Sequence, residues 1–427
     1  MITAAELVEL LGGKGEPNSL SPTAATRLGW TKLDELAAEV PPLVALRELA
    51  GSRPVVWLGM GGSSMGAHLM GELAGSARIT VVDSTHPSAL EVPADALVVV
   101  ASKSGGTFEV DVALAVLEGR GVAATDLVAL SDAGSELYER AASWALRIAT
   151  PDEVGGRFSA LSAFGLAAAA LVGLDPEAIL EGARTADLEA AVGNGLAAAS
   201  MPGYPFLAME GLGGGFVDLW LEQLIAESSG KQGRGYVPLA GRGTWRSSTA
   251  DPMGGERELG RFLQESMACC VAMCAAIDVD PFDQPDVDAT KAITARLLAG
   301  APLPVVDRVE LDRLAEVVGS ARYVALDAYL DPATWPRIRA LATDLEASLG
   351  LPVVAGMAPR MLHSTGQLHK GGPEGVLTVQ VLEAGGVDVE VPGRPYSMRM
   401  VLEAQAAGDA EALAAKGHRV LRASAPV

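Results

Sequence analysis

Aromatic residues, histidine, cysteine and positive charge are all scarce in this chain of 427 residues. Phe, Trp and Tyr make up only 4% of the sequence, although 49% of its residues are hydrophobic. Small and aliphatic side chains must therefore fill the core, and this composition suits layered α/β folds better than an all-β sandwich. At roughly 100–200 residues per domain, the length predicts two or three domains.

Basic residues are few, because 32 Lys and Arg stand against 53 Asp and Glu, which gives a formal net charge of −21. Such a charge opposes binding to the phosphates of nucleic acids and to acidic membrane surfaces. We therefore expect neither a nucleic-acid partner nor a membrane partner. A site that binds a phosphate must overcome the same negative field, so a lysine inside such a site carries particular weight.

Cysteine occurs only three times, as Cys269, Cys270 and Cys274 in one apolar segment that contains no histidine. This pattern predicts buried thiols in a core helix of a protein from a reducing compartment. The first residues lack the basic and apolar regions of a signal peptide, and the apolar stretch 158–174 is short for a membrane span. The sequence thus predicts a cytoplasmic location.

Short apolar segments alternate with helical segments in two parts of the chain, which predicts parallel sheets covered by helices on both faces. Strand-like segments of the first part cover residues 54–60, 77–83, 96–102, 126–131 and 146–150. Those of the last part cover residues 323–326, 352–356, 376–381 and 420–423. Residues 155–300, which lie between the two parts, are predicted to be mostly helical.

Two glycine-rich loops with serines follow predicted strands in the first part. Residues 59–64 read Gly-Met-Gly-Gly-Ser-Ser, and residues 102–107 read Ser-Lys-Ser-Gly-Gly-Thr. Glycine lets the backbone approach an anion closely, and the N–H groups and dipole of a helix start favour negative charge. Ligands bind at the carboxyl ends of parallel strands, where both loops fall. The pair of loops therefore predicts a site for one phosphate group.

The first loop also has features of a dinucleotide-binding motif, because Asp83 ends the second predicted strand 24 residues after Gly59. However, Ser64 stands where that motif has its third glycine, and a second anion loop has no role in a dinucleotide site. These differences favour a sugar-phosphate site over a nicotinamide-dependent enzyme and over plain strand–helix turns.

Two further residues combine charge with an unusual setting. Arg157 lies between two glycines and an apolar helix, where it could pair with a surface carboxylate or stabilise a developing oxyanion. Glu227 lies at the end of an apolar helix, beside a Ser-Ser-Gly turn, and shares a helix face with Gln223. A lone glutamate is usually solvated, but this position makes Glu227 a candidate general base.

The densest polar cluster of the chain covers residues 363–373 and holds two of its five histidines, His363 and His369. Their spacing does not match a zinc pair on a helix and no cysteine is close, so we expect no metal site. A catalytic or substrate-binding loop is favoured over an ordinary surface loop.

Five motifs together resemble the glucose-6-phosphate isomerase family, in the family's order. They lie at residues 59–63, 102–107, 155–159, 227–231 and 282–291. The cluster at 363–373 resembles the isomerase half of bacterial transaldolase/glucose-6-phosphate isomerase fusion proteins. The resemblance implies an α/β fold of two sugar-isomerase (SIS) domains, each a parallel sheet flanked by helices. It also implies reversible isomerisation of glucose 6-phosphate to fructose 6-phosphate, a step of glycolysis and gluconeogenesis, without cofactor or metal.

The resemblance predicts a division of the chain into four parts. Residues 1–50 form an N-terminal helical segment, and residues 51–155 form the first SIS domain with the phosphate loops. Residues 156–300 are the helical part of the second SIS domain, with Glu227 and Lys291, and residues 301–427 complete that domain.

The resemblance also assigns roles by position. Glu227 would be the base that moves a proton between C1 and C2 through a cis-enediolate, and Arg157 would stabilise that enediolate. Lys291, with a histidine, would assist opening of the sugar ring. The residues expected to bind substrate are Gly62, Ser63, Ser102, Lys103, Ser104, Thr107, Gln223, Gln284 and His363.

The ring-opening histidine is where this sequence departs from the family. The family has it between the glutamate and lysine motifs, but no histidine occurs between Glu227 and Lys291. We expect His369 to act instead, because it follows Gln367 at nearly the family's spacing, with His363 as the second candidate. In typical members the histidine comes from the partner subunit of a dimer, so action in cis and action in trans within a homodimer both stay open.

Two alternative functions share the same motifs. One is a dual glucose/mannose phosphate isomerase, and the other is a non-catalytic protein that binds sugar phosphates. A non-catalytic protein would not need Glu227, Arg157 and Lys291 together.

Overall fold

The first unit of the chain is a parallel sheet with helices on both faces. The computed structural model describes residues 2–212, 215–383 and 385–425, without the side chains of residues 287–289. Its first sheet has five parallel strands in the order β2-β1-β3-β4-β5. They are β1 (Val55–Leu58), β2 (Ile79–Val82), β3 (Leu97–Ala101), β4 (Leu127–Asp132) and β5 (Leu146–Thr150). All five strand predictions for this part are confirmed.

Alternate residues of the central strands face two different apolar clusters, as the period of two in a strand requires. On β1, Val55 and Trp57 pack with residues of α3 (Val40–Ala50), α4 (Gly62–Leu73) and α7 (Ala163–Val172). Val56 and Leu58 pack on the other face with residues of α5 (Phe108–Gly119). Burial on both faces explains why these strands are continuous apolar runs rather than alternating ones.

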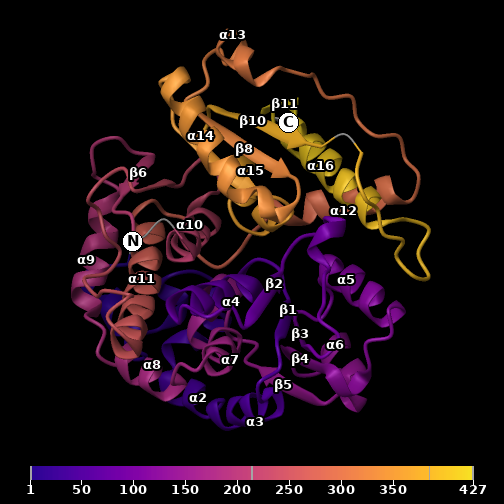
Figure 1. Cartoon of the computed structure of the whole chain (residues 1–427). Coiled ribbons are helices and arrows are strands. Elements are labelled where there is room, and N and C mark those ends of the chain that lie inside the picture. Colours follow the sequence, from indigo (N-terminus) through magenta and orange to yellow (C-terminus); the bar gives the residue numbers. More distant parts are fainter. Residues whose placement is uncertain (1, 213–214, 384, 426–427) are drawn as a thin grey trace.

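The middle of the chain is mostly helical, as predicted, and packs against the first unit (Figure 1). Its principal helices are α8 (Pro176–Ala183), α9 (Leu188–Ala198), α10 (Phe216–Ser229), α11 (Glu256–Ala276) and α12 (Val287–Leu298). The cysteines lie buried in α11 as unpaired thiols, which confirms the prediction of buried thiols in a core helix. Among the described residues, no helix is both long enough and apolar enough to cross a membrane.

Two short strands in the middle of the chain were not predicted. β6 (Phe206–Met209) and β7 (Val237–Ala240) pair in parallel and form a small separate sheet. Pro205 directly precedes β6 and Pro238 lies within β7, so the local sequence contains residues that argue against a strand. Residues 210–236 separate the two strands along the chain, and only folding brings the strands together.

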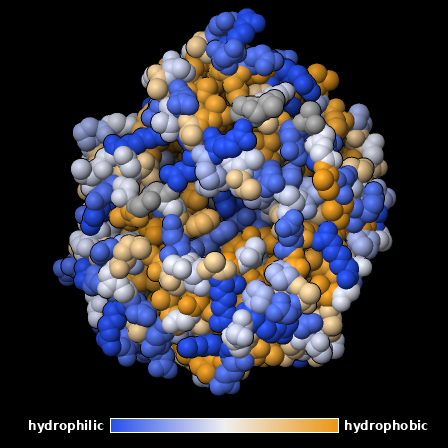
Figure 2. Space-filling model, viewed as in Figure 1, coloured by the Kyte–Doolittle hydropathy of each residue, from blue (hydrophilic) through white to orange (hydrophobic). Residues whose placement is uncertain are grey.

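The last unit is a second parallel sheet, drawn in orange and yellow in Figure 1. Its strand order is β11-β10-β8-β9, and the four predicted strands are confirmed. The strands are β8 (Tyr323–Tyr329), β9 (Val353–Met357), β10 (Val376–Leu382) and β11 (Arg419–Ser424). The accompanying helices are α14 (Trp335–Leu349), α15 (Gly366–Gly371) and α16 (Met398–Ala415), and α12 packs against α16. Figure 2 shows hydrophilic and hydrophobic residues interspersed over one face of the molecule.

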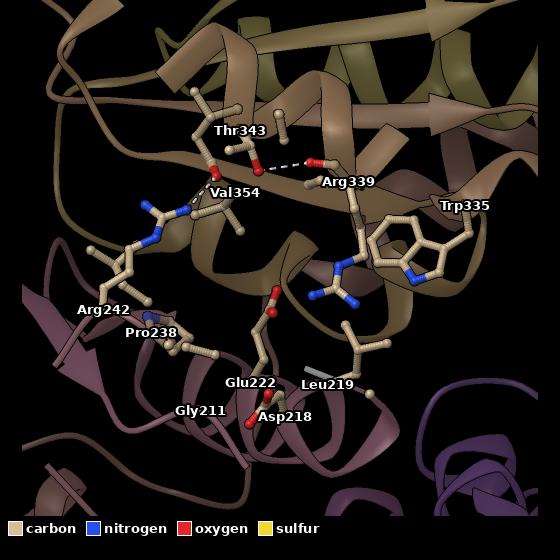
Figure 3. A pocket seen from close by; sticks show the side chains of 17 residues that line it. Gly211, Asp218, Leu219, Glu222, Pro238, Arg242, Trp335, Arg339, Thr343 and Val354 are labelled. Carbon is tan, nitrogen blue, oxygen red and sulfur yellow. Dashed lines mark hydrogen bonds between the residues drawn. The ribbon is translucent and has the colours of Figure 1, made fainter. Parts of the chain in front are cut away.

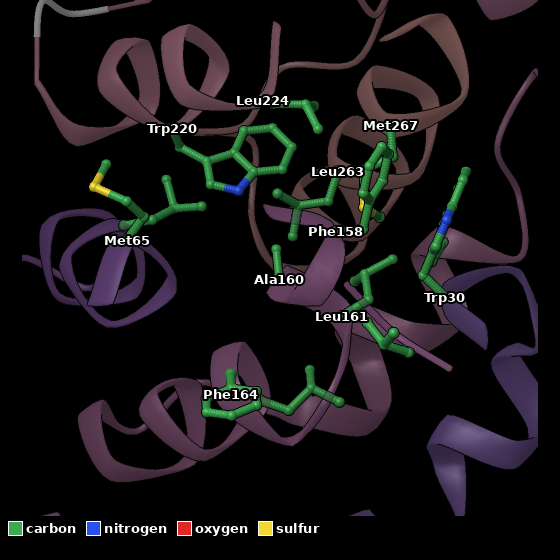
Figure 4. Packing of buried hydrophobic residues seen from close by; sticks show 14 of the residues in the cluster. Trp30, Met65, Phe158, Ala160, Leu161, Phe164, Trp220, Leu224, Leu263 and Met267 are labelled. Atoms are coloured by element: carbon green, nitrogen blue, oxygen red, sulfur yellow. The ribbon is translucent and has the colours of Figure 1, made fainter. Parts of the chain in front are cut away.

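Phe158 anchors the segment that carries Arg157 in the main apolar cluster (Figure 4). Its ring stacks on Trp30 at a centroid distance of 5.4 Å and lies 5.3 Å from the ring of Phe282. Aromatic contacts of this kind add to the stabilisation from burial. Phe158 therefore fixes the Arg157 segment against the segment at residues 280–284.

Glu39 gives a prediction for stability. Burial raises the pKa of Glu39 to about 7, although its carboxylate accepts a hydrogen bond from Ala163 N at 2.8 Å, at the start of α7. Because the folded pKa lies above the unfolded value of 4.5, the folded state binds more protons between these values, and stability falls as the pH rises from about 4.5 to 7. Glu39→Gln should therefore stabilise the protein by at most about 3 kcal/mol at pH 8 and much less at pH 5.

Urea unfolding of the native protein and of Glu39→Gln at pH 5 and pH 8 measures this difference. Glu35→Gln is the matched control, because Glu35 lies in the neighbouring helix α2 (Leu33–Ala37) with its side chain 72% exposed. A Glu39→Gln effect that is equal at the two pH values would contradict the assignment.

Candidate active site

The two predicted phosphate loops lie at the carboxyl ends of β1 and β3, directly before α4 and α5. Gly61 has φ +55°, a conformation that glycine adopts without strain. A Cβ on Gly62 would lie 2.0 Å from the carbonyl oxygen of Gly156, so only glycine allows these backbones to touch. Gly62 therefore packs the first loop directly against the segment that carries Arg157.

The serines of these loops differ in exposure. Ser63 and Ser102 are buried, and the Ser102 hydroxyl lies 2.7 Å from the hydroxyl of Thr107, the residue before α5. Ser104 is exposed. Lys103 forms an ion pair with Asp132 at the end of β4 and donates to the carbonyl oxygen of Asp152 at 3.1 Å. In this conformation Lys103 therefore points toward β4 rather than into the pocket described next.

A pocket of about 330 Å³ lies between the second loop, α12 and the segment that follows β9. Ser104 and Thr107 line one side, Lys291 lines another, and His363 and Gln405 complete the wall. This volume suits a small ligand. The structure thus brings the second predicted phosphate loop together with Lys291 and His363, two residues that are far from it in the sequence.

Arg157 and Glu227 form a direct pair. Arg157 Nη1 donates to Glu227 Oε1 at 2.8 Å and to Gln284 Oε1 at 3.1 Å. The rest of the guanidinium group donates to backbone carbonyl oxygens of Pro281 and Asp283 at 2.7–3.2 Å. The Arg157 side chain is only 4% exposed, so these contacts hold its charge in a largely dry site. A fixed cation in such a setting stabilises a nearby negative charge strongly.

Gln223 connects Glu227 to the backbone of His363. Its Nε2 donates to Glu227 Oε2 at 3.1 Å and to the backbone carbonyl oxygen of His363 at 3.0 Å. Gln223 and Glu227 lie one turn apart on α10, so they share a helix face as predicted. Both carboxylate oxygens of Glu227 are therefore held, one by Arg157 and one by Gln223.

His363 has partners that sequence analysis did not identify. Its Nε2 lies 2.9 Å from Glu109 Oε1, and Gln405 Nε2 donates to the same oxygen at 2.8 Å. Burial opposes ionisation of Glu109, but the charge and hydrogen bond of His363 outweigh it and hold the pKa of Glu109 below its usual value. Glu109 lies two residues after the second loop, in the first turn of α5, and this position could have identified it as a candidate site residue from the sequence. No local sequence feature identifies Gln405.

His369 lies in a different environment. Its side chain is buried against Tyr323 of β8, and neither ring nitrogen has a hydrogen-bond partner among the described residues. Burial, together with the charges of Lys370 and His418, lowers the pKa of His369 to about 3. The ring is therefore neutral at physiological pH, and it does not line the pocket that contains His363.

Lys231 holds the segment that binds Arg157. Its side chain is 1% exposed, and its ammonium group pairs with Asp283 at 2.6 Å and also donates to the carbonyl oxygen of Asp280. Burial and the neighbouring Arg157 charge lower the pKa of Lys231. The segment it fixes supplies both carbonyl oxygens and Gln284 to Arg157, which gives the lysine of the 227–231 motif a positioning role.

Curated relatives of this chain carry the name glucose-6-phosphate isomerase. The protein of Synechococcus elongatus is 39% identical over 163 residues, which cover 33% of this chain and 31% of that protein. The protein of Geotalea daltonii is 37% identical over 150 residues, which cover 31% of this chain and 28% of that protein. The matched part thus spans about a third of these relatives. No model of a known protein family matches the chain.

A solved structure agrees with the fold. The crystal structure of a glucose-6-phosphate isomerase from Chlamydia trachomatis matches with a TM-score of 0.52 at 19% identity, over 69% of this chain and 78% of that one. The fold and the site define an α/β protein with two helix-flanked parallel sheets and glycine-rich loops at the carboxyl ends of the first. Within that class, about a third of the chain is similar in sequence to curated glucose-6-phosphate isomerases, which agrees with the resemblance of its ordered motifs.

Proposed function

We propose that this protein interconverts glucose 6-phosphate and fructose 6-phosphate as an aldose–ketose isomerase. The observation that carries the proposal is the contact of Arg157 with Glu227, which shares α10 with Gln223, while Gln223 also binds the backbone of His363. A protein that only binds sugar phosphates has no need of a carboxylate held between a buried arginine and an amide. The names of the curated relatives support the same activity.

The proposed chemistry uses one carboxylate and one fixed cation. The glycine-rich loops hold the phosphate, and that binding energy keeps C1 and C2 of the sugar beside Glu227. Glu227 takes a proton from one carbon and returns it to the other. Arg157 stabilises the negative charge that develops on the enediolate oxygens between these two transfers. The proposal, like the sequence prediction, includes a cytoplasmic location and needs no cofactor.

We further propose that His363, rather than His369, assists ring opening together with Lys291. His363 and Lys291 line the same pocket, and Glu109 holds the imidazole ring in place. This revises the preference for His369, whose ring is buried without polar partners among the described residues.

His363→Asn should lower kcat with glucose 6-phosphate by about 10²-fold or more, which is the range of general acid–base catalysis. His369→Asn is the matched control and should retain most activity at equal fraction folded, measured by circular dichroism. Steady-state kinetics of the two variants decide between the histidines. A greater kcat loss in a folded His369→Asn than in His363→Asn would reverse the assignment.

The same geometry supports catalysis within one chain. Gln223 joins Glu227 to the His363 backbone of the same chain, so the histidine need not come from a partner subunit of a homodimer. Mixing Glu227→Gln protein with His363→Asn protein under subunit exchange should restore no activity. Recovery toward a quarter or more of native activity would show that a site is shared between subunits.

A coupled assay with purified protein tests the function itself. Fructose 6-phosphate should be converted to glucose 6-phosphate, which a glucose-6-phosphate-specific dehydrogenase detects. Mannose 6-phosphate as substrate separates the dual-specificity alternative from the narrow one. Tight binding of both hexose phosphates without turnover would instead support the non-catalytic alternative.

A further inference from the structure

A second pocket, of about 530 Å³, lies outside the proposed active site. One wall is formed by α10 and the turns that follow β6 and β7, and the other by α14 and β9 (Figure 3). It therefore opens at the carboxyl ends of a parallel strand pair, the usual position for ligands in such sheets. Its volume falls within the range of small-molecule sites, about 300–1,000 Å³.

Two arginines from different elements approach this pocket from its two sides. Arg242 follows β7 and Arg339 lies on α14, and Figure 3 shows Glu222 of α10 between their guanidinium groups. Arg242 also pairs with Glu346 and donates to the carbonyl oxygen of Val353 at 3.3 Å, which fixes its orientation. Guanidinium groups match the geometry of phosphate and carboxylate oxygens and bind them through paired hydrogen bonds.

Two acidic residues, Glu222 and Asp218, share the pocket lining with these cations. Burial raises the pKa of Glu222 to about 8, against the opposing charges of Arg360, Arg242 and Arg339, so its carboxyl group is neutral at pH 7 and can donate a hydrogen bond. Asp218 accepts a hydrogen bond from Leu212 N at 2.9 Å. The pocket lining thus holds two guanidinium groups beside Asp218 and a neutral Glu222, and Glu346, which lies outside the lining, pairs with Arg242.

We propose that this pocket is a second binding site, which takes a small oxyanion, a phosphate or a carboxylate, between Arg242 and Arg339. The indole ring of Trp335 lies beside Arg339 and offers an apolar surface for the remainder of the ligand (Figure 3). This proposed binding site does not depend on whether the protein is an isomerase.

The second pocket is separate from the pocket of His363 but shares a helix with the proposed active site. The two pockets have no lining residue in common. A small cavity next to the second pocket is lined by both Glu222 and Gln223, neighbours on α10. An oxyanion held by Arg339 would therefore rest on the helix that presents Gln223 and Glu227.

Anomalous diffraction from soaked crystals locates the site directly, with selenate as the tetrahedral probe and 4-bromobenzoate as the carboxylate probe. A peak for either probe between Arg242 and Arg339 is the expected result, and the probe that gives it identifies the type of oxyanion. If both probes bind only at the loop of residues 102–107, or at no site, the proposal is overturned.

Calorimetry in solution gives a second measurement, made in a Thr107→Val background to weaken binding at the phosphate loop. Arg339→Ala should weaken binding of the probe found in the crystal at least about tenfold. Arg337→Ala is the matched control, since Arg337 is exposed on α14 and does not line the pocket. Unchanged affinity in Arg339→Ala, or an equal loss in Arg337→Ala, would overturn the proposal.

Discussion

Glu227→Gln is expected to lower kcat for interconversion of glucose 6-phosphate and fructose 6-phosphate by about 10²–10⁴-fold or more. The amide has the same shape, and its oxygen can still accept from Arg157, although its NH2 group cannot accept from Gln223. The amide cannot take a proton from carbon. Binding of the sugar phosphate should survive, because the glycine-rich loops that we propose to hold the phosphate are unchanged. Steady-state kinetics and calorimetry with fructose 6-phosphate measure the two effects separately.

Glu222→Gln is the matched control for this variant. Glu222 is the other glutamate on the same stretch of α10, but it lines the second pocket rather than contacting Arg157. Its replacement should leave kcat within a few fold of the native value. Near-native turnover in Glu227→Gln would exclude Glu227 as the base.

Arg157→Lys is expected to lower kcat by about 10²–10³-fold, with a smaller effect on KM. Lysine keeps the positive charge, but one ammonium group cannot reach Glu227, Gln284 and the carbonyl oxygens of Pro281 and Asp283 at once. The charge would therefore no longer be fixed where the enediolate forms. Full kinetics with both hexose phosphates provide the measurement.

Thermal unfolding must accompany this experiment, because Arg157 also joins the 280–284 segment to the rest of the site. Arg184→Lys is the matched control, since Arg184 forms an exposed pair with Asp34 at 2.9 Å and should change neither kcat nor Tm appreciably. If Arg157→Lys keeps native kcat and raises only KM, Arg157 binds substrate and does not stabilise the enediolate.

Local sequence was sufficient for most of the architecture. Central strands such as β1 and β3 are buried on both faces, so each appears in the sequence as an apolar run that can be recognised without its neighbours. The strands β6 and β7 were missed for two reasons. Prolines lie beside or within them, and each is paired only with the other, which is distant in the sequence. Pairing between distant segments is a property of the fold and leaves no local pattern.

The site was predictable where chemistry alone selects a residue. An arginine between glycines and an apolar helix, a glutamate at a helix end and glycine-rich loops after strands are unusual in the sequence itself, and they made Arg157 and Glu227 candidates. The family resemblance assigned Gln223 to the substrate. The choice between His363 and His369 was not accessible, because both lie in one polar cluster. Burial of one ring beside Tyr323 and pairing of the other with Glu109 distinguish them.

The amino-acid sequence by itself determined the alternation of strands and helices and the glycine-rich loops, and it suggested a candidate base, because these depend on residues close together along the chain. Only the tertiary structure decided which histidine reaches the pocket, that Glu109 and Gln405 hold it, and that Arg242 and Arg339 face each other across a second pocket. The reason is physical. Burial, charge pairing and cavity shape arise from contacts between residues tens to hundreds of positions apart, and only folding creates those contacts.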